Sequence, residues 1–246
     1  MKLAGKTDIG CTRSENQDDY RAARLPEGDA WGVVCDGMGG ANGGKLAASL
    51  ASARFERALQ GALARGEVAD PQNFLQQTIA DMNQTVHDQS LTGPEYRGMG
   101  TTAVCALVQR GVAHIVHVGD SRAYLRRGRR MIQLTKDHSM VQQLLESGQI
   151  TPEEAEKHPR KNLITRAVGV NESVQADYTC CPLAEGDILL LCSDGLSNLV
   201  SEEEMEQIIT NTSFFDVPDR LVQLALRAGG QDNITVLLMG TEPGEV

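Results

Sequence analysis

Aromatic residues are scarce in this 246-residue sequence, and positive charge is outweighed by negative charge. One Trp, four Tyr and four Phe leave little material for stacking nucleic-acid bases. The 23 Lys and Arg residues face 33 Asp and Glu residues, which gives a formal net charge of −10. Because a chain with this charge is repelled by phosphate backbones, we expect no nucleic-acid partner.

Long apolar runs are also missing from the sequence. No uninterrupted apolar stretch approaches the roughly 20 residues that a membrane span requires. Near the N-terminus, Lys2, Lys6 and Asp8 make the chain polar before the apolar core of a signal peptide can form. We therefore expect a cytoplasmic protein without a membrane partner.

The six cysteines show no C-x-x-C spacing that would indicate a zinc site. Cys35, Cys105 and Cys192 lie inside apolar stretches of the kind that form strands. Small buried thiols explain this pattern better than zinc ligands or a disulfide framework do.

Short apolar segments bounded by turn residues predict β-strands. These segments are residues 30–35, 102–108, 112–118, 188–192 and 234–239. Short turns at residues 109–111 and 126–129 predict hairpins, so the strands that they join are expected to be antiparallel.

Helical periodicity appears in other parts of the chain. Apolar residues recur at three- and four-residue steps over residues 44–64, 71–89 and 217–228. Capping boxes at Thr151 and Ser201 predict two further helix starts. Strands grouped in hairpins and helices grouped in pairs, without strict alternation, indicate a layered α+β domain spanning residues 1–246.

Four aspartates occupy similar positions relative to the predicted strands. Asp36, Asp120 and Asp194 each follow an apolar stretch, and Asp232 precedes the last one. Any one of them is explained by a turn beside a strand. Several carboxylates at one end of a sheet would repel one another unless a multivalent cation bridged them. Oxygen donors without nearby His and Cys favour Mg²⁺ or Mn²⁺, and four acids suffice for two ions.

A polar run near the N-terminus, residues 13–20, begins with Arg13. One interpretation is a solvated loop. The alternative is that Arg13 binds phosphate oxygens with its planar guanidinium group, while Asp18 orients a metal-bound water without contacting the metal itself.

Seven short motifs occur in a characteristic order along the chain. They are residues 13–18, 34–40, 100–102, 118–124, 134–139, 192–196 and 230–236. This ordered set resembles the metal-dependent Ser/Thr protein phosphatases of the protein phosphatase 2C type, in their bacterial single-domain form. The resemblance implies two antiparallel β-sheets packed as a sandwich with helices on the outer faces, an α-β-β-α arrangement within the α+β class.

The resemblance also implies roles for individual residues. Asp36 would bridge two metal ions, Mn²⁺ or Mg²⁺, and the Gly37 carbonyl would bind one of them. Asp194 and Asp232 would complete the other site, and Asp120 with Asp194 would hold a third, weaker ion.

Two positions depart from some members of the family. Met38 stands where some relatives have a His that is proposed to protonate the leaving group, and a thioether cannot donate a proton. A metal-bound water is the alternative general acid. Gln17 replaces an acid found in some relatives, so we assign it no direct metal contact.

The expected chemistry is hydrolysis of phosphoserine and phosphothreonine by a water that two metal ions activate. Two ions sharing Asp36 would lower the pKa of that water from about 16 towards 7. Arg13 and the ions would stabilise charge on the equatorial phosphoryl oxygens, so no phosphoenzyme is needed. The apolar surroundings of Cys35 and Cys192 argue against a thiolate nucleophile.

Residues 139–169 resemble the mobile flap beside the active site of this family, and we expect them to influence substrate choice. The alternative is a surface segment that only covers the edge of a sheet. The expected partners are phosphorylated Ser/Thr proteins and a cognate Ser/Thr kinase, with the chain acting as a monomer. Two other functions stay open, a non-catalytic phosphoprotein-binding pseudophosphatase and a metal-dependent hydrolase of another phosphate ester.

Overall fold

The computed structural model describes residues 1–65, 68–156 and 158–242, which form two packed β-sheets flanked by helices. One sheet contains β1 (Lys2–Asp8), β7 (Arg122–Arg127), β8 (Arg130–Gln133), β10 (Ile188–Cys192) and β11 (Ile234–Gly240). The other contains β2 (Asp18–Arg24), β3 (Ala30–Met38), β4 (Gly100–Thr101), β5 (Ala103–Gln109), β6 (Val112–Val118) and β9 (Asp177–Pro182).

Strand order places the most apolar strands in the middle of each sheet. The first sheet has the order β1-β11-β10-β7-β8, and the second has β2-β3-β5-β6-β9, with β4 paired to β3. The ladders between these strands are antiparallel. Every residue of β11 is buried, because one face meets the other sheet and the opposite face meets helices. The predicted hairpins and antiparallel sandwich are confirmed.

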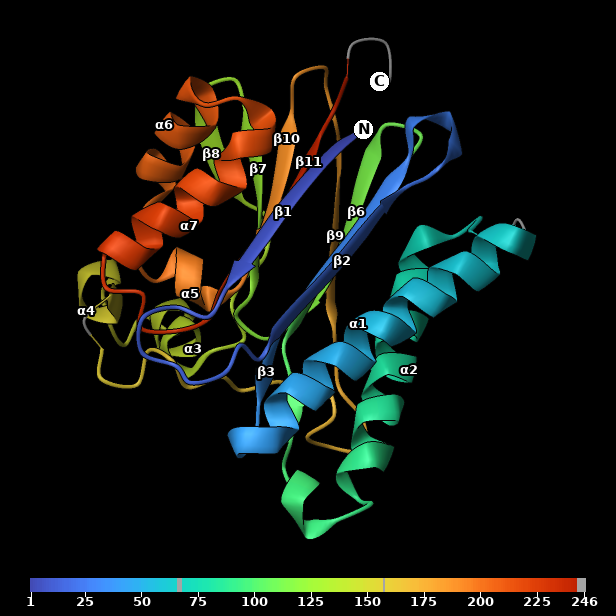
Figure 1. Ribbon diagram of the computed structural model, residues 1–246, viewed down its shortest axis with the longest axis vertical. Helices are drawn as coiled ribbons and strands as arrows, with labels where there is room; N and C mark the ends of the chain where they lie inside the picture. Colours follow the sequence, from blue (N-terminus) through green and yellow to red (C-terminus); the bar gives the residue numbers. More distant parts are fainter. Residues whose placement is uncertain (66–67, 157, 243–246) are drawn as a thin grey trace.

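Helices cover both outer faces of the sandwich, as Figure 1 shows. α1 (Gly40–Arg65) and α2 (Pro71–Ser90) pack on the second sheet, and α6 (Glu202–Asn211) and α7 (Val217–Arg227) pack on the first. Apolar clusters fill the space between the sheets and beneath each helical layer. The predicted α-β-β-α arrangement is confirmed.

Local signals in the sequence set the starts of several helices. The side chain of Asp70 accepts a hydrogen bond from the Asn73 amide at 3.1 Å, which caps α2. Ser201 and Glu204 form a reciprocal capping box at the start of α6. Each cap satisfies backbone N–H groups that have no partner within the helix.

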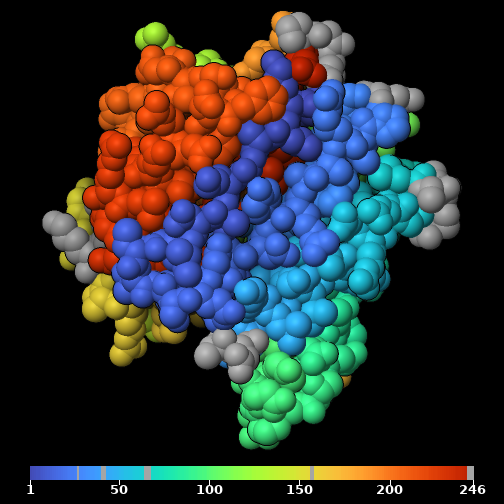
Figure 2. Space-filling model, viewed as in Figure 1, coloured from blue at the N-terminus to red at the C-terminus, as the bar shows by residue number. Residues whose placement is uncertain are grey.

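Four strands were not predicted: the two-residue β4 and three strands at sheet edges. β1, β2 and β9 have half-exposed residues and mix polar with apolar side chains, so they lack the apolar runs of central strands. The interpretation of residues 13–20 as one polar loop needs correction, because β2 begins at Asp18. In Figure 2 the N-terminal residues, in blue, form a surface band between the C-terminal helices and α1.

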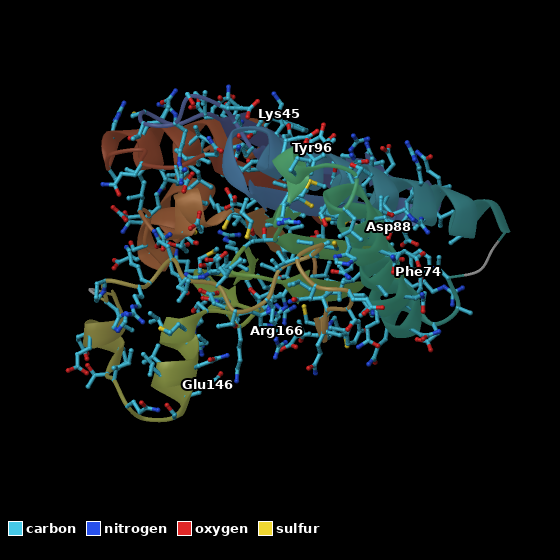
Figure 3. All side chains as sticks on the ribbon, turned by 90° about the horizontal axis from the view of Figure 1, so that it is seen from below. Lys45, Phe74, Asp88, Tyr96, Glu146 and Arg166 are labelled. Carbon is cyan, nitrogen blue, oxygen red and sulfur yellow. The ribbon has the colours of Figure 1, made fainter. Side chains whose placement is uncertain are left out.

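The predicted flap segment contains two short helices, α3 (Met140–Glu146) and α4 (Pro152–Glu156). These helices project from one side of the molecule, with Glu146 at the outer end of α3 (Figure 3). α5 (Asp194–Ser197) lies between β10 and α6. Within the described part of the chain, no helix has the length and apolar character needed to cross a membrane.

Candidate active site

Four aspartates from distant parts of the chain line one cavity of about 520 Å³. Asp36 lies in β3 and Asp120 follows β6, so the second sheet supplies two of them. Asp194 follows β10 and Asp232 precedes β11, so the first sheet supplies the other two. The cavity therefore lies where both sheets end, and the expected convergence of these acids is what the structure shows.

The backbone around Asp36 is fixed by two threonines. The Asp36 amide donates to Thr102 Oγ1 at 3.0 Å, and its carbonyl accepts from Thr101 Oγ1 at 2.9 Å. The next residue must be glycine, because a Cβ on Gly37 would lie 2.0 Å from the carbonyl oxygen of Gly44. This close approach of α1 to β3 positions both Asp36 and Gly37 at the cavity wall.

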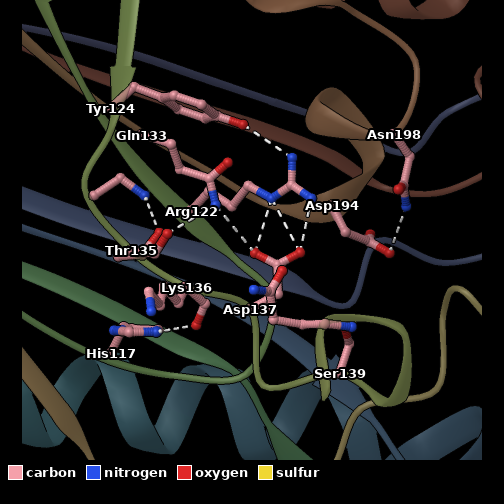
Figure 4. A network of polar contacts seen from close by, with 12 residues as sticks. His117, Arg122, Tyr124, Gln133, Thr135, Lys136, Asp137, Ser139, Asp194 and Asn198 are labelled. Carbon is pink, nitrogen blue, oxygen red and sulfur yellow. Dashed lines mark hydrogen bonds and ion pairs between the residues drawn. The ribbon is translucent and has the colours of Figure 1, made fainter. Parts of the chain in front are cut away.

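Asp194 begins α5, directly after β10. Its Oδ2 accepts a hydrogen bond from Asn198 Nδ2 at 3.0 Å, which Figure 4 shows. Its buried Oδ1 has no hydrogen-bond partner in the described structure. A carboxylate oxygen without a partner in a buried position is costly and is a suitable donor for a cation.

Asp18 is 8% exposed and lies between the two sheets. Its Oδ2 accepts hydrogen bonds from Ser193 Oγ at 2.7 Å and Thr235 Oγ1 at 2.6 Å. Its Oδ1 is a second buried oxygen without a partner among the described residues. Asp18 thus lies behind the cavity acids and is absent from the residues that line the cavity.

The acids influence one another electrostatically. Burial, followed by the charges of Asp18 and Asp194, raises the pKa of Asp36 well above its usual value. Burial also raises the pKa of Asp18 to about 7 and that of Asp120 to about 8. These shifts mean that the ionised forms of these acids are disfavoured in the folded chain, and a bound cation would stabilise them.

Arg13 lies at the rim of the same cavity. Its Nη2 donates to Asp232 Oδ2 at 2.6 Å, and its side chain is 54% exposed. The guanidinium group therefore reaches the acids, while about half of the side chain is exposed to solvent. This placement is compatible with the expected contact to phosphate oxygens.

Among the described residues, no group of three or more His, Cys, Asp and Glu side chains has the spacing of a preformed metal site. Arg13 Nη2 holds one carboxylate oxygen of Asp232. The donor chemistry nevertheless fits Mn²⁺ or Mg²⁺, because carboxylate oxygens, one of them the unpartnered Asp194 Oδ1, surround the cavity.

Two supporting residues were missed in the sequence. Asn233 Oδ1 accepts from the Gln17 amide at 2.8 Å, and its Nδ2 donates to the carbonyls of Ile9 and Glu15. Asn233 thereby ties the loop that carries Arg13 to the start of β11. Ser193 was also missed as the partner of Asp18, although Ser193 and Asp18 both lie within the seven motifs.

The neighbouring cysteines are poor nucleophiles. Cys35 and Cys192 are fully buried, and burial raises the pKa of Cys192 to about 12. Burial likewise raises the pKa of Cys35 well above its ordinary value. Because only a thiolate attacks efficiently, the structure agrees with the exclusion of a cysteine mechanism.

Comparison with known proteins agrees with the family resemblance of the sequence motifs. The protein phosphatase 2C family matches residues 12–238. Serine/threonine phosphatase stp of Listeria monocytogenes is 38% identical over 240 residues, which cover 97% of this chain and 95% of that protein. Protein phosphatase PhpP of Streptococcus pneumoniae is 39% identical over 244 residues, covering 97% of each.

Solved structures share the fold. The serine/threonine phosphatase PstP/Ppp of Mycobacterium tuberculosis has a TM-score of 0.87 and 34% identity, and 98% of each chain is covered. A crystal structure of the PstP catalytic domain in complex with two manganese ions has a TM-score of 0.80 and 34% identity over 96% of each chain.

The fold and the matched residues define a phosphatase of the metal-dependent type, and the chain belongs to the protein phosphatase 2C family. The prediction of a protein-serine/threonine phosphatase is confirmed by the same similarity.

Proposed function

We propose that this enzyme hydrolyses phosphoserine and phosphothreonine in proteins by direct attack of water, with two divalent cations held by Asp36, Gly37, Asp194 and Asp232. The observation that carries the proposal is the convergence of acids from four segments on one cavity. The PstP catalytic domain in complex with two manganese ions supports the number and kind of ion.

When bound, Mn²⁺ or Mg²⁺ supplies positive charge that lowers the pKa of water and polarises the phosphoryl group. Asp36 lies on β3 and Asp194 on the segment after β10, so ions held by both would connect the two sheets. The carboxylates of Asp36, Asp194 and Asp232 fix the reacting centre at the cavity wall. Asp120 with Asp194 would hold a third, weaker ion.

Arg13 binds and orients the phosphoryl group in this proposal. One of its nitrogens contacts Asp232, and the side chain is exposed enough to meet an entering phosphoprotein. Its planar set of N–H donors matches phosphoryl oxygens and stabilises their charge during attack.

Asp18 holds the attacking water in position. Ser193 and Thr235 donate to its Oδ2, which leaves Oδ1 to accept a hydrogen bond from the water. Met38 lines the cavity but cannot protonate the leaving group, so we assign that proton to a water molecule.

Substrate choice is assigned to the flap, residues 139–169. A second cavity of about 750 Å³ shares Asp120 and Asp194 with the first and is lined by Val141 and Leu145 of α3. A substrate chain whose phosphate enters the first cavity can therefore extend along the flap. We propose that the enzyme acts as a monomer and reverses the reaction of a cognate Ser/Thr kinase.

The direct test is phosphate release from a phosphoserine or phosphothreonine peptide with Mn²⁺, with Mg²⁺ and with excess chelator. We expect activity that depends on metal and is lost in Asp36→Asn and Asp194→Asn. Binding of the peptide without turnover would indicate a pseudophosphatase. Faster hydrolysis of small phosphomonoesters or diesters than of the peptide would indicate another phosphate-ester substrate.

A further inference from the structure

We propose that His138 is a positioning residue that fixes the turn carrying Asp120 and joins this turn to the stem of the flap. The inference rests on the proposed function, which assigns a weak third ion to Asp120. Its metal-binding consequence can be measured independently.

His138 and Gly119 form two reciprocal hydrogen bonds. The Gly119 amide donates to His138 Nδ1 at 3.1 Å, and the His138 amide donates to the Gly119 carbonyl at 2.9 Å. Gly119 has a φ of +104°, and a Cβ there would lie 2.6 Å from Thr102 Cγ2. Asp120 follows immediately and faces the cavity, so the bonds of Gly119 set the direction from which its carboxylate enters.

The bond from Gly119 also determines the protonation of the ring. Because Nδ1 accepts this hydrogen bond, it carries no hydrogen, and the hydrogen of the neutral imidazole is on Nε2. Nε2 lies 3.1 Å from Arg166 Nη1 and 3.4 Å from Asp177 Oδ2, and Arg166 Nη1 itself donates to Asp177 Oδ1 at 2.7 Å. Burial, with the neighbouring His117 and Arg166, lowers the pKa of His138 to about 4, which agrees with a neutral ring at pH 7.

The same residue connects both ends of the flap. The Thr165 amide donates to the His138 carbonyl at 2.7 Å, and Met140 donates to the Leu163 carbonyl at 2.9 Å. Arg166, labelled in Figure 3, belongs to the returning end of this segment. The flap stem and the Asp120 turn are thus attached to one residue.

A second histidine supports the ring of His138. His117 stacks on it with ring centroids 4.6 Å apart and an interplanar angle of 22°. His117 is itself held by a contact between Nε2 and the Lys136 carbonyl at 2.8 Å (Figure 4). The stacked ring of His117 restricts the ring of His138, so Nδ1 of His138 can act as a fixed acceptor for the Gly119 amide.

Two substitutions separate the contacts of the two ring nitrogens. In His138→Asn the side-chain oxygen can occupy the place of Nδ1 and accept from Gly119. In His138→Gln the amide reaches the place of Nε2 and keeps the contact with Asp177. His138→Ala removes both contacts and gives the full effect.

The experiment is a calorimetric titration of each variant with Mn²⁺, together with kcat and KM on a phosphopeptide. We expect the Mn²⁺ affinity of the weakest site in His138→Asn to stay within about threefold of wild type. In His138→Gln and His138→Ala the affinity of this site should fall roughly 10- to 100-fold. Their kcat at limiting Mn²⁺ should fall in parallel, with KM for the peptide little changed. Circular dichroism and thermal unfolding identify any variant that fails to fold.

The proposal is overturned if His138→Gln binds Mn²⁺ with wild-type affinity while His138→Asn binds it as weakly as His138→Ala, because the contact with Gly119 would then be unimportant. It is also overturned if all three folded variants bind Mn²⁺ like wild type. A wild-type protein that binds Mn²⁺ but releases no phosphate would contradict the proposed function alone, since the titration still decides the role of His138.

Discussion

Asp18 and Asp36 are directly opposite each other in the antiparallel ladder between β2 and β3. After burial, the charge of Asp18 is the largest influence that raises the pKa of Asp36. Two acids at opposing positions of a sheet destabilise the fold. The cation that we propose at Asp36 would explain their presence at this end of the sandwich.

The first prediction concerns Asp36→Asn. We expect phosphatase activity to fall below about 1% of wild type, because a carboxylate that we propose to hold the cations is lost. In excess chelator, the same variant should be about 1 to 2 kcal/mol more stable than wild type, because a destabilising buried charge is removed. Urea unfolding measures the stability, and lower stability in chelator would contradict the explanation given for the acid cluster. Asp29→Asn, on the loop before β3, is a matched control.

The second prediction concerns Thr235→Val. This change removes the hydroxyl that donates to Asp18 and contacts Thr7 Oγ1 at 2.7 Å, while it preserves side-chain volume. We expect a loss of about 1 to 3 kcal/mol in the free energy of unfolding and a lower kcat. Thr85→Val, in which a helical threonine loses its bond to a carbonyl, is the control. An unchanged kcat in the folded variant would exclude a role for this hydrogen bond in turnover.

The third prediction concerns Arg13. We expect Arg13→Ala to lower kcat/KM for a phosphopeptide roughly 100-fold and Arg13→Lys to retain part of the activity. Stability should change by less than about 0.5 kcal/mol, because the side chain is 54% exposed. Steady-state kinetics and thermal unfolding measure the two effects. Wild-type kinetics in Arg13→Ala would remove Arg13 from the proposed mechanism.

The fourth prediction concerns pH. Burial raises the pKa of Asp120 to about 8 and that of Asp18 to about 7, so the folded chain binds protons that the unfolded chain releases. The chelated protein should therefore gain about 2 to 3 kcal/mol of stability as the pH falls from 8.5 to 6.5. The Asp120→Asn variant should show a smaller gain.

Metal binding should reverse this dependence of stability on pH. Mn²⁺ requires ionised carboxylates, so its binding near pH 7 should release protons. Titration calorimetry in buffers of different ionisation enthalpy counts the protons released. Zero release, or a chelated protein that loses stability between pH 8.5 and 6.5, would contradict the raised pKa values.

The sequence predicted the central strands, the helix caps and the positions of the four acids. These features depend on neighbouring residues, such as the apolar run of β10 and the Ser201–Glu204 capping box. The edge strands β1 and β2 were not predicted, because their half-exposed residues become a strand only by pairing with β11 and β3.

By itself, the sequence determined the central strands and the helix starts, since periodicity and capping depend on residues that are close along the chain. Its short motifs also indicated which residues could carry the chemistry. Only the tertiary structure decided how these residues meet. Arg13 and Asp232 are separated by 219 positions, and Asp18 and Thr235 by 217, yet both pairs are in hydrogen-bond contact. The physical reason is that these contacts depend on strand order and sheet packing, which bring remote segments together and which no local pattern records.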